Sequence, residues 1–99
     1  MSKKNCIITG GTSGLGLALV KKFINNSFFV HILAKDNKKI QKLVNYFYER
    51  NIKSFKFYQA DLAEENELNK VILQIKNLDK IDVLINNAGA LFLKREENS

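Results

Sequence analysis

A glycine-rich turn near the amino terminus constrains the fold of this chain more than any other stretch. The segment Thr9-Gly10-Gly11-Thr12-Ser13-Gly14-Leu15-Gly16 follows a short apolar run and opens an amphipathic one. Its glycines can adopt positive φ, let a ligand approach the backbone and let the next helix pack close to a sheet. The first turn of that helix offers free N–H groups and the positive end of its dipole to an anion. The segment therefore predicts a strand, a phosphate cradle and a helix, in that order.

The rest of the chain continues this alternation. Apolar or β-branched runs at residues 4–9, 28–33, 52–59 and 81–85 predict four strands. Apolar residues at helical spacing predict three helices between them: one from the glycine turn to Asn25, one capped by Asn37 and one from about Glu64 to Leu78. Such alternation predicts right-handed βαβ crossovers and an α/β fold with a parallel sheet.

The topology then predicts where a ligand binds. The chain reverses direction beside the first strand, which sets the strand order 3-2-1-4 and brings the carboxyl ends of the strands to one crevice. Four segments meet there: the glycine turn, Ala34-Lys35, Ala60-Asp61-Leu62 and Asn86-Asn87-Ala88-Gly89. We expect Leu15 on the buried face of the first helix, and the apolar run Val83-Leu84-Ile85 in a strand suited to cover on both faces.

Length and charge limit the class of protein. With 99 residues, 45% of them hydrophobic, the chain can form one small domain with a core. The net charge of +6 allows two interpretations: the chain binds nucleic acid or another anionic surface, or its solvated surface is simply rich in lysine. The basic residues are spread from Lys3 to Lys94 with no run longer than two. We therefore favour the solvated surface and predict no nucleic-acid partner.

Single residues exclude further classes. Cys6 is the only cysteine, which excludes an intrachain disulfide and a cysteine-based metal cluster, and we expect it in the core. His31 lies between Val30 and Ile32 and is expected to be a strand histidine with one polar contact, not a catalytic group. No apolar stretch is long enough for a signal peptide or membrane span, so we expect a cytoplasmic protein with no membrane partner.

Three motifs at the strand ends make the chain resemble the N-terminal part of a classical short-chain dehydrogenase/reductase. The family's Thr-Gly-x-x-x-Gly-x-Gly matches Thr9, Gly10, Gly14 and Gly16, its Asp-Leu matches Asp61-Leu62, and its Asn-Asn-Ala-Gly matches Asn86 to Gly89. The resemblance covers essentially the whole chain. It implies a Rossmann-type NAD(P)-binding domain over residues 1–99, belonging to an oxidoreductase that interconverts a carbonyl and an alcohol.

The resemblance also implies residue roles. Backbone N–H groups around Thr12 to Leu15, with the Ser13 hydroxyl, would hold the pyrophosphate. The Asp61 carboxylate would accept from the adenine amino group, and the backbone of Asn87 would meet the adenosine ribose. The predicted cofactor-binding residues are Gly10, Thr12, Ser13, Gly14, Leu15, Gly16, Lys35, Asp61, Leu62, Asn87, Ala88 and Gly89, while Asn86 and Gly89 would fix the last turn. Two plainer interpretations remain: Asp61 as a helix cap, and residues 86–89 as an ordinary turn.

The residues after the second strand bear on the choice of cofactor. An acidic residue there binds the ribose 2′-hydroxyl, whereas a basic one accommodates a 2′-phosphate. Alignment with the family places Ala34 where the acid would stand and Lys35 where NADP-preferring members often carry arginine. NADP is therefore favoured, with NAD possible. A one-residue shift would place Asp36 at the acidic position and reverse the preference, and Lys35 can also be read as a solvated loop lysine.

The family's hydride chemistry uses a serine and a tyrosine followed four residues later by lysine. Here Tyr46 is followed at that spacing by Arg50, Tyr48 by Ile52 and Tyr58 by Leu62. We therefore expect no catalytic residue and no turnover from this chain alone, with a substrate and a homo-oligomer only in a complete protein. We expect a truncated or split reading frame, or the start of a longer protein, whose fourth strand is an exposed edge.

Residues 90–99 resemble a loop of retinol-dehydrogenase-like members of the family. Two other interpretations of the chain remain open. One is a non-catalytic nucleotide-binding or regulatory module that senses NADP(H) or docks on a full-length relative, and the other is an unfolded relic.

Overall fold

The computed structural model describes residues 3–87, which form a three-layer α/β fold. The elements in chain order are β1 (Lys4–Thr9), α1 (Gly14–Asn25), β2 (Phe28–Ala34), α2 (Asn37–Glu49), β3 (Phe55–Gln59), α3 (Glu65–Ile75) and β4 (Val83–Asn86). Every strand pairing is parallel and the strand order is β3-β2-β1-β4. The predicted fold class and strand order are confirmed.

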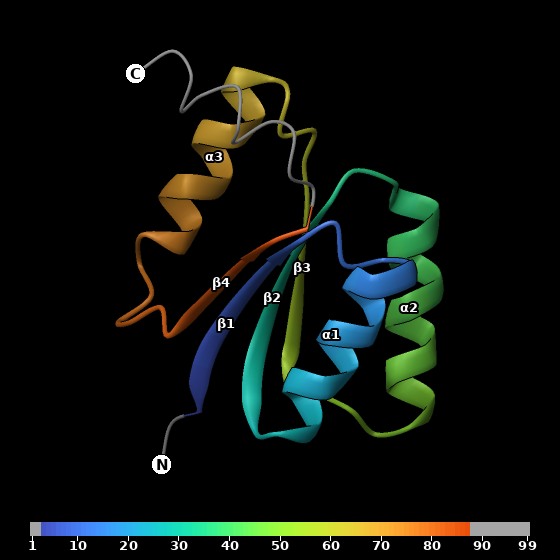
Figure 1. The fold of residues 1–99 in the computed structure, drawn as a ribbon. Coiled ribbons are helices and arrows are strands. Elements are labelled where there is room, and N and C mark those ends of the chain that lie inside the picture. The colour runs from blue at the N-terminus through green and yellow to red at the C-terminus, as the bar shows by residue number, and fades with distance from the viewer. Residues whose placement is uncertain (1–2, 88–99) are drawn as a thin grey trace.

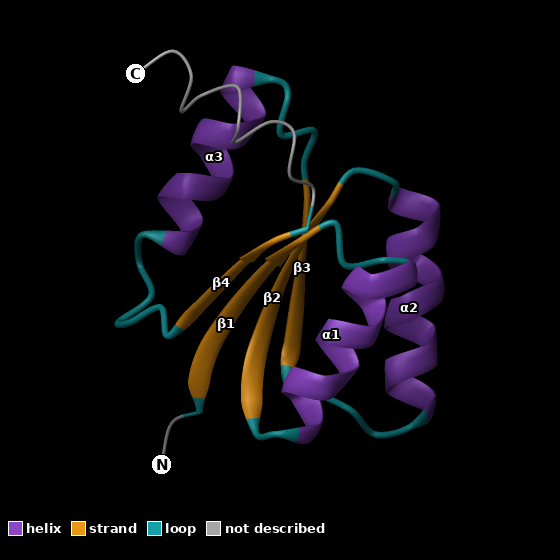
Figure 2. Ribbon diagram, viewed as in Figure 1, coloured by secondary structure: helices purple, strands orange, loops and turns teal. Residues whose placement is uncertain are grey.

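The helices lie on both faces of the sheet. Figures 1 and 2 show α1 and α2 together against one face and α3 alone against the other. This follows from right-handed crossovers in a sheet whose strand order turns back at β1, because the last crossover then runs on the opposite side.

Alternate residues of the strands supply two hydrophobic cores. Toward α1 and α2 the fully buried cluster consists of Cys6, Ile8, Val20, Val30, Ile32 and Phe47. Toward α3 a smaller cluster consists of Ile7, Leu33, Tyr58, Ala60 and Val71. Side chains of a strand point to opposite faces in turn, so neighbours such as Cys6 and Ile7 enter different cores. The predicted core position of Cys6 is confirmed.

Two boundaries around α2 differ from the prediction. The residue that caps α2 is Asp36, not Asn37, because the Asp36 carboxylate accepts from the backbone N–H groups of Lys38 and Lys39. At the other end Asn51 adopts a φ of 57°, and the N–H of Ile52 donates back to the carbonyl of Phe47 over 2.9 Å. The helix end uses these residues, so β3 begins at residue 55 and not at residue 52.

Two apolar residues expected to be buried are exposed. Leu15, in the first turn of α1, is 69% exposed. Leu84 of β4 is 62% exposed, since no described element covers that part of the face on which α3 packs. The exposure of Leu84 shows that the prediction of cover on both faces of this strand is wrong. Within residues 3–87, β4 pairs with β1 alone and is an edge of the sheet, as predicted.

None of the helices described between residues 3 and 87 is both long and apolar enough to cross a bilayer.

Candidate functional site

The carboxyl ends of the four strands gather at one edge of the sheet. Figure 1 shows the carboxyl ends of β1, β2, β3 and β4 at this edge, as the topology predicts. Two backbone hydrogen bonds extend the ladder beyond the strands: Gly10 N–H donates to the carbonyl of Leu33, and Ala60 N–H to that of Ala34, each over 2.9 Å. The three strand ends are thus held together as a rim.

The glycine turn folds back on the start of α1. Gly10 and Gly14 have positive φ values of 69° and 56°, which side chains other than glycine rarely adopt. Gly16 is needed for a different reason. A Cβ at Gly16 would lie 2.1 Å from the carbonyl oxygen of Gly10 and 2.6 Å from the side-chain nitrogen of Asn87. The absence of a side chain at residue 16 therefore lets α1, the turn and the end of β4 meet.

The amino terminus of α1 presents backbone donors to solvent. Ser13 precedes the helix with an extended φ of −157°, and its side chain makes no capping hydrogen bond. Ser13, Gly14 and Leu15 are exposed. N–H groups in a first helical turn have no partner within the helix, and they carry the positive end of its dipole. The residues predicted to hold a pyrophosphate thus lie at an exposed helix amino terminus, a position that generally suits an anion.

A cavity of about 250 Å³ lies beside this turn. It is lined by Gly10, Leu33, Ala34, Lys35, Ala60, Asp61, Leu62 and Ala63. Four of the predicted site residues, Gly10, Lys35, Asp61 and Leu62, therefore share one cavity between the ends of β1, β2 and β3.

The Asp61 carboxylate lies in this cavity with two partners. Its Oδ1 accepts from the N–H of Ala63 over 3.0 Å, and its Oδ2 lies 3.4 Å from Nζ of Lys35. Its own backbone N–H donates to Oε1 of Glu67 on α3 over 3.1 Å. The residue that caps α3 is Glu64, so the helix-cap interpretation of Asp61 is wrong. Asp61 instead closes a short turn at the cavity.

Asp36 caps α2, whereas the alignment shifted by one residue would have it bind the ribose 2′-hydroxyl. Its Oδ1 accepts from the N–H groups of Lys38 and Lys39 over 2.9 and 3.3 Å. Asp36 does not line the cavity, whereas Lys35 does. The sequence pattern could have shown this cap, since aspartate is among the preferred residues at that position.

The end of β4 is fastened to the glycine turn by two side chains. The hydroxyl of Thr9 donates to Oδ1 of Asn86 over 3.1 Å, and Nδ2 of Asn87 donates to the carbonyl of Gly10 over 2.9 Å. Both asparagines therefore hold the rim together. Ala88 and Gly89, with the segment 90–99, lie outside the described residues.

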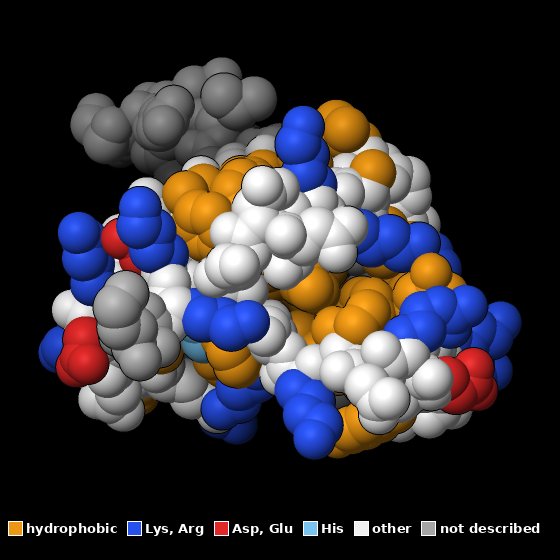
Figure 3. All heavy atoms as spheres, turned by 90° about the horizontal axis from the view of Figure 1, so that it is seen from below, with side chains coloured by type: hydrophobic (Ala, Val, Ile, Leu, Met, Phe, Trp, Pro, Cys, Tyr) orange, Lys and Arg blue, Asp and Glu red, His pale blue; other side chains and the backbone are white. Residues whose placement is uncertain are grey.

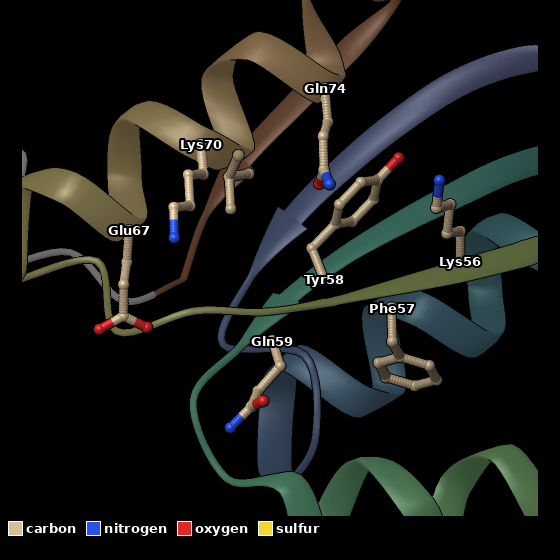
Figure 4. A pocket seen from close by; sticks show the side chains of 8 residues that line it. Lys56, Phe57, Tyr58, Gln59, Glu67, Lys70 and Gln74 are labelled. Atoms are coloured by element: carbon tan, nitrogen blue, oxygen red, sulfur yellow. The ribbon is translucent and has the colours of Figure 1, made fainter.

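A larger cavity, of about 330 Å³, lies between β3 and α3, away from the rim. Figure 4 shows Tyr58 and Lys56 of β3 on one side of it, with Lys70 and Gln74 of α3 on the other. None of the predicted site residues lines it.

His31 of β2 makes two polar contacts, where one was expected. Its Nδ1 lies 2.8 Å from the Tyr58 hydroxyl and its Nε2 lies 3.0 Å from Oδ1 of Asn5. Burial, with a smaller contribution from the charge of Lys56, lowers the pKa of His31 from its ordinary value of 6.5. His31 is thus a buried neutral side chain that links three strands.

Two features bear on the predicted partners. Figure 3 views the molecule from the amino ends of the strands, where lysine and arginine side chains lie in separate groups between uncharged and hydrophobic ones. This face carries no continuous basic patch of the kind that binds nucleic acid. Among residues 3–87, no group of three or more His, Cys, Asp or Glu side chains could hold a metal ion.

Comparison with known proteins gives a consistent family. A family model described as short chain dehydrogenase matches residues 4–99. The chain is 33% identical to a 3-amino-tetrahydro-pyrrolizinone reductase of Xenorhabdus hominickii, over 90% of this chain and 29% of that protein.

Solved structures agree with the fold. A bulky-bulky ketone specific alcohol dehydrogenase from Comamonas testosteroni superposes with a TM-score of 0.77 at 27% identity, over 90% of this chain and 37% of that one. A short-chain dehydrogenase from Sphingobium yanoikuyae in complex with NADPH gives 0.76 at 27% identity, over 87% and 34%. The chain thus spans about a third of the length of the proteins that it matches.

Proposed function

We propose a function from one premise: this chain belongs to the short-chain dehydrogenase family. Residues 1–99 form one NAD(P)-binding unit that binds NADP(H) in preference to NAD(H), as part of an oxidoreductase acting on a carbonyl and alcohol pair. The observation that carries the proposal is the meeting of Gly10 of the glycine turn, Lys35 and Asp61 around one cavity.

The glycine turn fits a diphosphate. A Cβ built at Gly14 meets no atom within 4 Å, so the space above the first turn of α1 is open to a ligand. The exposed N–H groups of that turn and the Ser13 hydroxyl would donate to the phosphate oxygens. Thr12 and Leu15 flank these donors, and Gly10 and Gly16 keep the turn close to the helix.

The cavity fits the adenosine end. The Asp61 carboxylate would accept from the adenine amino group, and the Leu62 backbone would line the ring. Asn87, held to Gly10 by its amide, would meet the ribose through its backbone. By resemblance to the family, Ala88 and Gly89 remain proposed cofactor-binding residues in the same turn.

The preference for NADP(H) rests on two neighbouring residues. Asp36, which could bind a 2′-hydroxyl, is engaged by the backbone of α2. Lys35 lines the cavity and can pair with a 2′-phosphate. The NADPH complex of the Sphingobium relative supports the same preference.

When bound, the dinucleotide would supply or accept the hydride of the reaction. The residues named above would hold and orient it, and we assign proton transfer to none of them. A second candidate function is binding of NADP(H) without turnover. It is favoured by the sequence, in which none of the three tyrosines has a lysine four residues later.

The test is a titration of the chain with NADPH, read by nicotinamide fluorescence, together with a thermal melt. We expect saturable binding, and its loss in Gly14→Val, since valine strains a φ of 56° and fills the space above the turn. The matched control is Ser27→Val, which places valine at a φ of 67° at the far end of α1. A folded wild-type chain that does not bind NADPH would contradict the proposal.

A hydride-transfer assay with carbonyl substrates then separates the two candidates. Reduction above background that is lost in Gly14→Val supports an oxidoreductase. Binding without reduction supports the nucleotide-binding module.

A further inference from the structure

The ion pair between Lys35 and Asp61 follows from the register of two parallel strands. Ala34 of β2 is paired with Gln59 of β3, and Ala60 N–H donates to the carbonyl of Ala34. Lys35 is the first residue beyond β2 and Asp61 is the second beyond β3, and the two side chains meet with 3.4 Å between Nζ and Oδ2. The pair lies in the lining of the cavity beside the glycine turn.

The two partners are not equally free to move. The Asp61 side chain is 29% exposed, and Oδ1 is held by the Ala63 N–H. Its backbone is held by Glu67. The Lys35 side chain is 77% exposed and has a long flexible stem. Any rearrangement at this pair is therefore a movement of Lys35 away from a fixed Asp61.

We infer that Asp61 is a specificity-determining residue that opposes the 2′-phosphate by competing for Lys35. This inference rests on the proposed function. Selectivity for NADP(H) over NAD(H) is then set by the Lys35–Asp61 pair and not by Lys35 alone. A 2′-hydroxyl carries no charge, so it does not attract the Lys35 ammonium away from Asp61. A 2′-phosphate must draw Lys35 from Asp61 or share it with that carboxylate.

The alternative carboxylate beside Lys35 does not serve this purpose. Asp36 follows Lys35 directly, but its Oδ1 already accepts from two backbone N–H groups of α2. Among the described residues, Asp61 is the carboxylate that lies within ion-pair distance of Lys35. Its charge is therefore the one whose removal frees the lysine.

The test compares dissociation constants for NADPH and NADH in the wild-type chain and in Asp61→Asn. Asparagine keeps an acceptor for Ala63 but removes the charge that holds Lys35. We expect the ratio of the NADH to the NADPH dissociation constant to rise by about two- to fivefold, the range that exposed ion pairs span. Loss of the contact between Asp61 and the adenine amino group weakens the binding of NADPH and of NADH equally, so it leaves this ratio unchanged.

Two further variants identify the cause. In a Lys35→Met background the Asp61→Asn substitution should change the ratio by less than half as much, because no lysine remains to be released. Glu49→Gln is the matched control. It removes a carboxylate from the Glu49–Arg50 pair at the other end of α2, and it should leave the ratio unchanged.

The outcomes are distinguishable. A ratio that stays constant or falls in Asp61→Asn overturns the inference, and so does an equal rise with and without Lys35, which would indicate direct repulsion. A wild-type chain that binds neither cofactor overturns the proposed function and this inference together. If Asp61→Asn does not melt cooperatively, Asp61→Ser replaces it, since a serine hydroxyl can accept from the same N–H.

Discussion

The side-chain amide of Asn87 donates to the carbonyl of Gly10 over 2.9 Å and joins positions 77 residues apart in the chain. A Cβ at Gly16 would lie 2.6 Å from this same Asn87 nitrogen. One hydrogen bond thus fixes the glycine turn between the end of β4 and the start of α1. We infer that this hydrogen bond holds the glycine turn in the conformation that we propose binds the diphosphate.

The first prediction concerns that hydrogen bond. Asn87→Asp keeps the side-chain shape but replaces the donor with a carboxylate facing the Gly10 carbonyl. We expect a loss of about 1 kcal/mol in the free energy of unfolding, since a typical hydrogen bond contributes about that much. NADPH binding should weaken by about fivefold, which corresponds to the same free energy.

The control is Asn69→Asp, an equal change at an exposed position of α3. Urea denaturation and NADPH titration of both variants measure the two effects. Equal behaviour of the two variants would show that the Asn87 contact does not hold the turn.

The second prediction separates the two kinds of glycine in the turn. In Gly16→Ala the new methyl group would lie 2.1 Å from the Gly10 carbonyl oxygen, so backbone must move. Overpacking of this kind costs about 1–3 kcal/mol, and we expect the upper end because the obstacle is backbone. In Gly14→Ala the methyl group meets no atom within 4 Å, and only the φ of 56° resists it.

Gly14→Ala should therefore be destabilised by about 1 kcal/mol, at the lower end of the cost of a left-handed residue. Urea denaturation of both variants gives the order of stability. A Gly16→Ala protein as stable as Gly14→Ala would mean that α1 and the turn are not in close contact.

The fold was predictable because each element carries its own local signal. Apolar runs set the strands, helical spacing set the helices, and alternation with a glycine turn set the topology. The errors at the two ends of α2 were at positions where two local signals compete. Asp36 and Asn37 are both suitable caps, and Ile52 fits a strand although the end of α2 uses it.

The site was predictable only as far as its location. The glycine turn, Lys35 and Asp61 were placed at one rim by topology alone, and the structure brings them to one cavity. The ion pair between Lys35 and Asp61 could not be foreseen, because it depends on the register of β2 with β3. The link of His31 to Asn5 and Tyr58 depends on register in the same way.

The third prediction concerns the thiol of Cys6. The side chain is fully buried, and burial raises its pKa from 9.0 to about 11. The reactive thiolate is therefore scarce at neutral pH, and reagent cannot reach it without opening of the core. Because the core opens only rarely in the native state, we expect alkylation of the native chain at pH 8 to be slower than in denaturant by a factor on the order of 100 or more.

Native labelling at the denatured rate would contradict the position of Cys6 in the core. The rate as a function of urea also distinguishes local from global opening. Global opening predicts that the labelling rate follows the unfolding free energy measured by circular dichroism.

His31 has a defined tautomer in this structure. Nδ2 of Asn5 donates to the carbonyl of Lys80 over 2.9 Å, so Oδ1 of Asn5 faces the imidazole as an acceptor. Nε2 of His31 must then carry the proton, and Nδ1 accepts from the Tyr58 hydroxyl. This neutral arrangement uses every polar atom of the ring.

The fourth prediction is that stability falls on acidification through His31. The pKa of His31 is lowered in the fold, by burial first and by the charge of Lys56 second. Between the folded pKa and the ordinary value of 6.5, the unfolded chain binds more protons than the native one. The contribution of His31 to the free energy of unfolding is therefore present above pH 6.5 and is lost as the pH falls through the folded pKa.

The measurement is urea denaturation at pH values from neutral to mildly acidic, with three variants beside the wild type. His31→Phe should lack this loss of stability, and Lys56→Met should reduce it because a charge that lowers the pKa of His31 is gone. Lys53→Met removes an equal charge at an exposed residue before β3 and should leave the loss unchanged. If His31→Phe loses as much stability as the wild type over this pH range, protonation of His31 does not cause the loss. Carboxylates that both proteins share would then account for it.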